Sequence, residues 1–345
     1  MASFEQTIFV FEQRKYSLQE ILALKSAPDW LQTVQNQLID FTSTRNEMEF
    51  HTSGSTGMPK RIVHRKTVLE SSAKRTLDYF SLKPGDSAAL ILPAEFIGGS
   101  MMLVRALIGG LTLHLLPPKL AVNEIPNVDF LPCTPAQFKA ALQNDVLSDF
   151  NGAILLGGAP VGDIEPVVGI NLYVGYGMTE TASHVALRPL TEKVYSAVDG
   201  VEFSTREGAL VIDAPHLGVK ELQTNDLVRL IDPHSFEFIG RLDDVINSGG
   251  LKIHPAVLES HFHSNGCVVC ISSIADKVYG EAVVIVVEGG VSESRVKKLL
   301  KDVPRNQQPK FILSADRLPF LESGKLDRNE VRRLIQESQH RLSPL

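Results

Sequence analysis

The sequence has few cysteines and no excess of positive charge. Three cysteines among 345 residues cannot build a disulfide framework, which favours a reducing compartment such as the cytoplasm. The net charge is −6 and no basic run is present, so we expect no nucleic-acid partner. No apolar run reaches the length of about eighteen residues that suggests a membrane span. The polar start MASFEQTIFVFEQRKYS also differs from a signal peptide.

Two common catalytic motifs are missing as well. A Walker A loop requires Gly-Lys followed by Ser or Thr, whereas Lys60 is followed by Arg61 and Lys325 by Leu326. No G-x-S-x-G nucleophile motif occurs anywhere. These absences argue against a P-loop kinase and against an α/β-hydrolase.

Residues 51–64, HTSGSTGMPKRIVH, concentrate glycine and hydroxyl side chains in front of Lys60. Glycine exposes backbone N–H groups, short hydroxyls add donors, and a lysine adds charge, which together suit phosphate oxygens. The same residues also mark an ordinary hairpin turn, and both flanks, 48–50 and 61–64, have strand-like sequences. The loop alone leaves both interpretations open.

From residue 86 onward, short apolar runs alternate with helix-like segments. We expect strands at 87–92, 111–116, 129–135, 152–158 and 171–177, and a helix at 97–108. This alternation predicts an α/β fold in which a large N-terminal domain has mostly parallel sheets covered by helices. Ligands of such sheets bind beyond the carboxyl ends of the strands, where GGAP (157–160) and YGMTE (176–180) are found.

The pattern changes after about residue 240. Two helix-like segments, 253–266 and 292–303, lie among the strand-like runs 267–274, 281–290 and 310–316, and the chain ends in a third helical pattern at 326–342. We therefore expect a smaller, mobile α+β domain over 241–345 after an N-terminal domain over 1–240. The charged and glycine-rich stretch IGRLDDVINSGGLKI predicts a hinge near 241–246.

Four stretches follow one another in a characteristic order: SGSTGMPK (53–60), YGMTET (176–181), GRLDDVINSGGLKIHPAVLE (240–259) and LPFLESGKLDR (318–328). With Asn225-Asp226 between the second and third, this order resembles the acyl-adenylate-forming superfamily, which includes acyl-CoA ligases, carrier-loading adenylation domains and luciferases. The resemblance covers nearly the whole chain from His51. It implies that a carboxylate attacks the α-phosphate of ATP, and that a thiol, usually coenzyme A, then attacks the acyl-adenylate.

The resemblance also implies a role for each matching residue. The nucleotide-binding set is Thr52, Ser53, Gly54, Ser55, Thr56, Gly57, Lys60, Gly158, Ala159, Pro160, Tyr176, Gly177, Met178, Thr179, Asp226 and Arg241. Lys325, Glu180, Thr179 and Lys60 form the catalytic set, and Glu180 is the expected Mg²⁺ ligand. Phe96, Gly157, Gly158 and Gly177 line the acyl pocket, Asp243 is the hinge residue, and Gly249 and Gly250 belong to the coenzyme A site. Because Lys60 and Lys325 fall in different predicted domains, both can serve one ATP only if the domains close.

The acyl substrate is the least determined part of this interpretation. YGMTETASH (176–184), TPAQ (134–137) and the compact size resemble o-succinylbenzoate–CoA ligases of menaquinone synthesis, but Phe96 stands where those ligases have histidine. A ligase for another carboxylic acid, a carrier-loading enzyme and a non-catalytic nucleotide-binding module stay open as alternatives. Only fifty residues precede His51, fewer than is usual in the superfamily, so we expect an abbreviated first subdomain that a homodimer partner would cover.

One further group of residues suggests metal binding. His261, His263, Cys267 and Cys270 have zinc-ligand chemistry, but their order and spacing do not match the usual modules. The two cysteines lie in an apolar, strand-like run, where cysteine behaves as a small hydrophobic residue. We expect no zinc site there.

Overall fold

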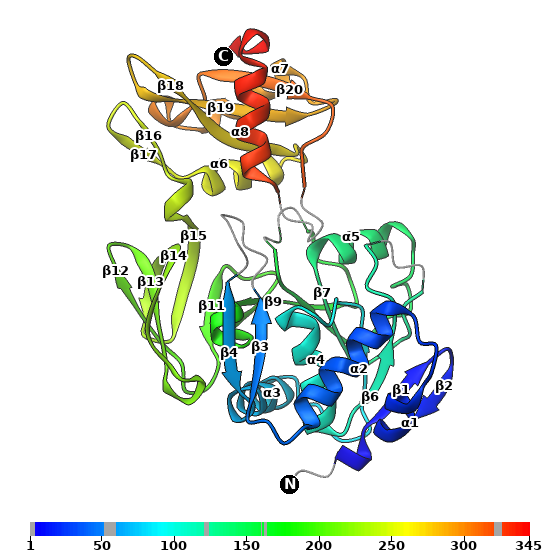
Figure 1. Ribbon diagram of the computed structural model, residues 1–345. Helices are drawn as coiled ribbons and strands as arrows, with labels where there is room; N and C mark the ends of the chain where they lie inside the picture. Colours follow the sequence, from blue (N-terminus) through cyan, green and yellow to red (C-terminus); the bar gives the residue numbers. More distant parts are fainter. Residues whose placement is uncertain (1–3, 52–59, 121–123, 160, 162–163, 321–325) are drawn as a thin grey trace. The chain divides into compact units, whose positions relative to one another are not determined.

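The computed structural model describes residues 4–51, 60–120, 124–159, 161, 164–320 and 326–345 (Figure 1). The chain divides into two compact units. Unit 1 comprises residues 1–203, 212–222 and 232–235, and unit 2 comprises residues 204–211, 223–231 and 236–345. The domain boundary predicted after residue 240 and the hinge predicted near 241–246 stay predictions.

Unit 1 is built on a sheet whose strands lie in the order β11-β10-β9-β8-β7-β5-β6-β1-β2. The strands are β1 (Ile8–Phe11), β2 (Arg14–Tyr16), β5 (Ser87–Leu90), β6 (Thr112–Leu115), β7 (Phe130–Cys133), β8 (Ala153–Leu156), β9 (Asn171–Gly177), β10 (His184–Pro189) and β11 (Val194–Ala197). Neighbours from β1 through β6, β5, β7 and β8 to β9 are parallel, whereas β2, β10 and β11 pair antiparallel. The predicted mostly parallel sheet is confirmed.

Within the described residues of unit 1, five α-helices and three short 3₁₀ turns accompany this sheet. They are η1 (Phe4–Gln6), α1 (Leu18–Ala23), α2 (Asp29–Thr42), α3 (Lys66–Tyr79), α4 (Ile97–Gly109), α5 (Pro135–Gln143), η2 (Thr179–Thr181) and η3 (Pro215–Leu217). Helix α4 packs against α2, α3 and β5, which explains why nine of its residues are buried. The predicted helix over 97–108 is thereby confirmed.

A separate two-stranded hairpin flanks the predicted phosphate loop. It consists of β3 (Glu47–His51) and β4 (Arg61–Arg65), and its last pair joins His51 to Arg61. Both strand-like flanks predicted from the sequence are therefore strands. The loop residues 52–59 lie outside the described residues.

Four strands between residues 202 and 241 are neighbours in chain order and contribute to both units. They are β12 (Glu202–Arg206), β13 (Ala209–Ala214), β14 (Val219–Asp232) and β15 (Ser235–Arg241).

The remainder of unit 2 is the expected α+β structure. Its elements are η4 (Leu242–Asp244), β16 (Ile246–Ser248), β17 (Leu251–Ile253), α6 (Pro255–His263), β18 (Val269–Asp276), β19 (Gly280–Glu288), α7 (Glu293–Leu299), η5 (Leu300–Asp302), η6 (Arg305–Gln307), β20 (Phe311–Ala315), α8 (Arg328–Glu337), η7 (Gln339–Arg341) and β21 (Ser343–Pro344). The sheet runs β17-β16-β19-β20-β21, with β18 also paired to β19.

Strand β19 connects the two hydrophobic cores of unit 2. Val283, Ile285 and Val287 pack in the core that contains α6 and α7, whereas Val284 and Val286 pack in the core beneath α8. This alternation follows from the two-residue period of a strand, and it makes β19 apolar on both faces. Within the described stretches, no helix is both long enough and apolar enough to cross a membrane.

Candidate active site

The strand that leaves the predicted phosphate loop is tied to the YGMTE segment. His64 on β4 is 6% exposed, and its Nε2 lies 2.6 Å from the backbone oxygen of Thr179. Because a carbonyl oxygen can only accept, the His64 Nε2 carries the proton and donates. Lys60, just before β4, is exposed. The structure thus joins two of the predicted motifs, while Thr52, Ser53, Gly54, Ser55, Thr56 and Gly57 lie outside the described residues.

The segment after β9 is a tight turn closed by the hydroxyl of Thr181. This oxygen accepts from the N–H of Met178 (3.0 Å) and donates to the backbone oxygen of Ser183 (2.7 Å). Ala182 has φ +62°, which is rare for a residue with a side chain. Glu180, the predicted Mg²⁺ ligand, is partly exposed in the middle of η2. The turn therefore holds Thr179 and Glu180 in a defined backbone conformation.

Gly177 allows the close backbone approach on which this turn depends. A Cβ added there would lie 2.2 Å from the backbone oxygen of Ser183 and 2.5 Å from the Cα of His184. No side chain can occupy that space without moving β10. Gly177 thus has a structural role besides the ligand role predicted for it.

The second predicted site loop follows β8, the parallel neighbour of β9. Because β8 and β9 are parallel, Gly157 and Gly158 leave the sheet at the same edge as Tyr176 and Gly177. Gly158 has φ +78°, and a Cβ added at Gly157 would have no neighbour within 4 Å. The structure brings these two glycine loops to one edge, as predicted, and Ala159 follows directly. Pro160 lies outside the described residues.

Tyr176 has an aromatic neighbour at the end of β9. The rings of Tyr176 and Tyr195 meet edge to face with centroids 5.9 Å apart. The guanidinium of Arg188 lies 5.0 Å from the centre of the Tyr195 ring. This packing fixes the edge of Tyr176, which is the residue predicted to stack on adenine.

Arg105 is a candidate site residue that the sequence analysis missed. It lies on α4 and is 2% exposed, and its Nη2 donates to Ser183 Oγ at 2.6 Å. Among the described residues, its buried Nε has no acceptor and no carboxylate lies within ion-pair distance. Burial lowers the pKa of Arg105 to about 10, so the side chain stays charged at neutral pH. The signal in the sequence was a single arginine within the apolar helix IGGSMMLVRALIG.

A hydrogen-bonded relay behind Arg105 contains no negative charge. Ser183 Oγ lies 3.4 Å from His184 Nδ1, and His184 Nε2 lies 3.3 Å from Thr76 Oγ1, which donates to Ser72 O. Burial, aided by the nearby Arg105, lowers the pKa of His184 to about 3, so its imidazole is neutral. His184 Nε2 donates to Thr76, Ser183 donates to His184 Nδ1, and Ser183 accepts from Arg105. Every member is neutral except Arg105, whose charge this relay leaves unbalanced.

Phe96 and the TPAQ motif have clear structural positions. Phe96 is the N-cap residue of α4 and its side chain is 43% exposed, which is compatible with the predicted lining role. TPAQ forms a capping box at the start of α5, in which Thr134 and Gln137 exchange hydrogen bonds. The Gln137 side chain also donates to the backbone oxygen of Ile91 at 2.7 Å. TPAQ therefore contributes to the core rather than directly to a ligand.

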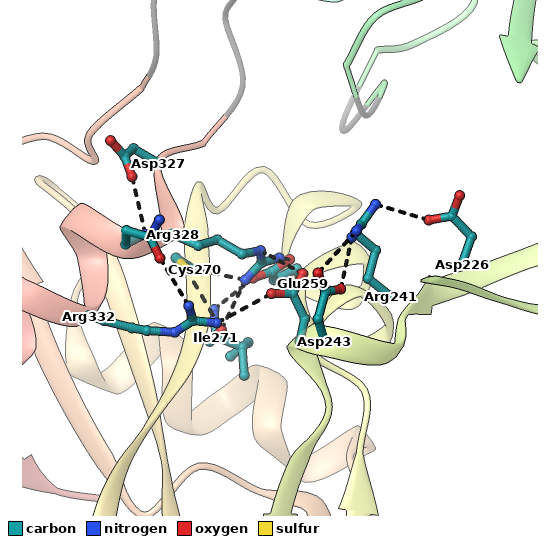
Figure 2. A network of polar contacts seen from close by, with 11 residues as sticks. Asp226, Arg241, Asp243, Glu259, Cys270, Ile271, Asp327, Arg328 and Arg332 are labelled. Atoms are coloured by element: carbon teal, nitrogen blue, oxygen red, sulfur yellow. Dashed lines mark hydrogen bonds and ion pairs between the residues drawn. The ribbon is translucent and has the colours of Figure 1, made fainter. Parts of the chain in front are cut away.

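The predicted residues of unit 2 fall into two groups. Asp226 on β14 is 8% exposed and lies 3.3 Å from Arg241 Nη1, so the structure brings these two predicted nucleotide ligands together (Figure 2). Arg241 also donates to the carboxylate of Asp243 through Nε and Nη2. The hydrogen bond to Asp243 and the nearby Asp226 raise the pKa of Arg241.

Gly249 and Gly250, predicted for coenzyme A, form an exposed turn after β16 with positive φ at both residues. Lys325 lies outside the described residues.

The residues with zinc-ligand chemistry make other contacts. His261 Nε2 lies 3.0 Å from Leu299 O and His263 Nε2 lies 3.1 Å from Val269 O. Cys267 and Cys270 are buried, and burial raises the pKa of Cys270. Within the described part of the chain, no group of three or more histidine, cysteine or acidic residues could hold a metal ion.

Comparisons with known proteins agree with this arrangement. Residues 46–215 match the AMP-binding enzyme family. The 2-succinylbenzoate–CoA ligase of Bacillus mycoides is 28% identical over 336 residues, which cover 83% of this chain and 70% of that protein. The ligase of the same name from Escherichia coli K12 is also 28% identical, covering 84% of this chain and 69% of that protein.

A solved structure matches over nearly its entire length. The acyl-CoA synthetase (AMP-forming)/AMP-acid ligase II-like protein from Dyadobacter fermentans is 30% identical, with a TM-score of 0.59. The match covers 92% of this chain and 98% of that chain. From the motifs, the parallel sheet with its two glycine loops and these relatives, we conclude that the chain belongs to the AMP-binding enzyme family.

Proposed function

We propose that the chain is an ATP-dependent, AMP-forming acyl-CoA ligase whose acid carries a second carboxylate. The first candidate for that acid is o-succinylbenzoate, whose conversion to o-succinylbenzoyl-CoA is a step in menaquinone synthesis. The acid would be activated as an acyl-adenylate with release of pyrophosphate, and coenzyme A would then displace AMP to give the thioester.

The observation that carries the substrate proposal is the buried charge of Arg105. A buried cation without a counter-ion costs several kcal/mol, roughly 3–5 when one partner of a buried pair is missing. The relay through Ser183 and His184 supplies hydrogen bonds but no charge. A guanidinium with a free Nε–H pairs well with a carboxylate. A ligand carboxylate would balance the charge of Arg105.

o-Succinylbenzoate has the required chemistry because it carries one aliphatic and one aromatic carboxylate. One is available for adenylation, and the other can pair with Arg105. This assignment also answers the difficulty raised by Phe96, which cannot donate to a carboxylate. Two curated relatives at 28% identity carry the name of this activity, which supports the choice.

The remaining assignments follow from the resemblance. Bound Mg²⁺ would neutralise charge on the phosphates of ATP. Glu180 is the one carboxylate of the described η2 turn, which fits an ion that takes one or two protein carboxylates besides phosphate oxygens. Lys60 and the 52–57 loop would hold the phosphates, Tyr176 the adenine, and Asp226 with Arg241 the ribose and phosphate. Lys325 would stabilise the adenylation transition state, and Gly249-Gly250 would contact coenzyme A.

The wider setting of the reaction is also proposed. We propose a cytoplasmic enzyme with its domain boundary after residue 240 and Asp243 as the pivot. We also propose a homodimer in which a second copy of the chain covers the acyl pocket.

The test compares o-succinylbenzoate with two analogues that each lack one carboxylate, 4-oxo-4-phenylbutanoate and 2-butyrylbenzoate. ATP–pyrophosphate exchange is measured for the wild type and for Arg105→Gln. Loss of a buried ion pair of roughly 3–5 kcal/mol corresponds to a factor of about 10² to 4 × 10³ in kcat/KM. We expect the wild type to prefer o-succinylbenzoate over the better analogue by such a factor, and Arg105→Gln to lose most of that preference.

Arg75→Gln is the matched control. Arg75 lies on the neighbouring helix α3 and bonds the backbone oxygen of Asp199, so its loss removes an arginine without touching the relay. It should retain the wild-type preference. Equal use of o-succinylbenzoate and the better analogue by the wild type would refute the second carboxylate. ATP–pyrophosphate exchange with an unrelated acid in place of o-succinylbenzoate would show that another acid is the substrate. Tight ATP binding without exchange would favour a non-catalytic module.

A further inference from the structure

The turn η4 contains two adjacent aspartates that are held by different parts of unit 2. Asp243 accepts two hydrogen bonds from Arg241, at 2.9 Å from Nε and 3.0 Å from Nη2, and Arg241 also contacts Asp226 on β14 (Figure 2). The side chains of Asp243 and Arg241 are 41% and 46% exposed. An ion pair with this exposure is screened by solvent and separates at little cost.

Asp244, the next residue, pairs instead with two arginines of helix α8. Its Oδ2 lies 3.2 Å from Arg328 Nε, and its Oδ1 lies 3.5 Å from Arg332 Nη2. The Asp244 side chain is only 18% exposed. Both aspartates line a polar cavity of about 310 Å³, which leaves free volume beside the turn.

Arg328 is itself fixed by the interior of unit 2. Its Nη2 lies 2.7 Å from Glu259 Oε2 on α6, and its Nη1 donates to the backbone oxygen of Ile271 on β18 at 3.2 Å (Figure 2). Glu259, 7% exposed, closes the arrangement by accepting from the N–H of Ile271 at 2.8 Å. Burial alone would lower the pKa of Arg328, but the carboxylate of Glu259, with Cys270 and Asp244, holds it above its usual value. One guanidinium therefore joins α6, β18 and α8 to the η4 turn.

We propose that Asp244 is a positioning residue that fixes the η4 turn to α8, so that the backbone rotation between the two half-reactions is confined to the N-terminal side of Asp244. The proposal rests on the two-step ligase reaction proposed above. The exposed pair on Asp243 is the one that opens, whereas the partly buried contacts of Asp244 with Arg328 and Arg332 persist. The described elements from Asp244 to β20, together with α8, then turn as one body.

The test uses Asp244→Asn, which leaves the pair between Arg328 and Glu259 intact. Glu330→Gln is the matched control, because Glu330 is also a carboxylate paired with an arginine of α8, but both groups are exposed. ATP–pyrophosphate exchange reports the first half-reaction. Single-turnover transfer from preformed acyl-adenylate to coenzyme A reports the second. We expect Asp244→Asn to lower the rate constant of both by about tenfold, with KM for ATP and acid unchanged, because a loose turn populates both closed orientations poorly.

Amide hydrogen exchange provides a readout that does not require activity. The N–H of Val245 donates to Leu242 O at 3.3 Å and closes the turn, while the N–H of Gly249 donates to Tyr279 O at 2.8 Å elsewhere in unit 2. In Asp244→Asn we expect faster exchange at Val245 and unchanged exchange at Gly249. The Glu330→Gln control should leave both amides as in the wild type.

The outcomes separate this inference from the proposed function. Rates and Val245 exchange equal to those of Glu330→Gln would overturn the role of Asp244, as would an effect on KM alone. If the wild type lacks both half-reactions, the ligase function fails while hydrogen exchange still tests the contact. If Asp244→Asn does not fold, Arg332→Gln removes only the second, half-exposed partner and should show the same changes at smaller amplitude.

Discussion

Gly157 and Gly177 lie at the ends of two neighbouring parallel strands, yet alanine should destabilise the protein at Gly177 and leave its stability nearly unchanged at Gly157. Alanine at Gly177 would place its Cβ 2.2 Å from the backbone oxygen of Ser183. Alanine at Gly157 would meet no atom within 4 Å. The pair isolates the close approach of β10, because both changes add a single methyl group at the same edge of the sheet.

The magnitude follows from the contact at Gly177. Carbon atoms in van der Waals contact sit about 3.5–4.0 Å apart, so the backbone at Ser183 and His184 would have to move by roughly 1 Å. Forcing one methyl group into a packed site costs about 1–3 kcal/mol. For a unit of about 200 residues, each kcal/mol lowers Tm by roughly 2–4 °C, which gives a drop of about 2–12 °C. For Gly157→Ala we expect a change within about 0.5 kcal/mol.

Thermal unfolding followed by circular dichroism gives Tm for both variants and the wild type. The kinetics of ATP–pyrophosphate exchange show whether Gly157 contacts the acid. If Gly157 lines the acyl pocket, its alanine variant raises KM for the acid at unchanged Tm. A wild-type Tm for Gly177→Ala, or a large drop for Gly157→Ala, would refute the reasoning from backbone contact.

Three further results are expected. Thr134→Ala removes the side-chain cap of α5 and should lower the free energy of unfolding by about 0.5–2 kcal/mol in urea titrations, while Thr33→Ala, at a partly exposed position within α2, should not lower it. Cys133, Cys267 and Cys270 are buried, so the native protein should not react with a thiol reagent within the time in which the urea-unfolded chain reacts completely; fast labelling of the native protein would contradict this. The carboxylate of Asp129 accepts hydrogen bonds from the side chain and the backbone N–H of a serine, which lower its pKa below 3.8. The charged Asp129 carboxylate therefore stabilises the fold above its unfolded pKa, and this stabilisation is lost as pH falls through its folded pKa. Asp129→Asn should be less stable than the wild type at pH 7 and equally stable in strong acid. The free energy of unfolding measured across an acid titration tests this.

Secondary structure and fold class were predictable because each element carried a local signal. The apolar runs ended by glycine became β8 and β9, and the helical pattern at 97–108 became α4. The continuous apolar run at 281–290 became β19, whose side chains pack in two cores, one on each face of the strand. These signals depend on periodicity and on glycine or proline at the ends of elements, which one sequence displays directly.

The roles of individual residues were harder to predict because they depend on contacts between distant segments. Arg105 had no motif around it, and its significance appears only when α4 places it against Ser183, 78 residues away. Similarly, nothing in the sequence indicates that Asp243 pairs with Arg241 whereas the adjacent Asp244 pairs with α8. TPAQ suggested a family likeness, and its physical role as a helix cap required the structure.

The central claim is that this chain adenylates a carboxylic acid, and ATP–pyrophosphate exchange tests it most directly. The wild-type protein would be assayed with ATP and labelled pyrophosphate, in the presence and absence of o-succinylbenzoate and of Mg²⁺. We expect exchange that depends on the acid and on Mg²⁺, followed by AMP and thioester formation when coenzyme A is added. Nucleotide binding with no acid-dependent exchange, across o-succinylbenzoate and a panel of other carboxylic acids, would contradict it.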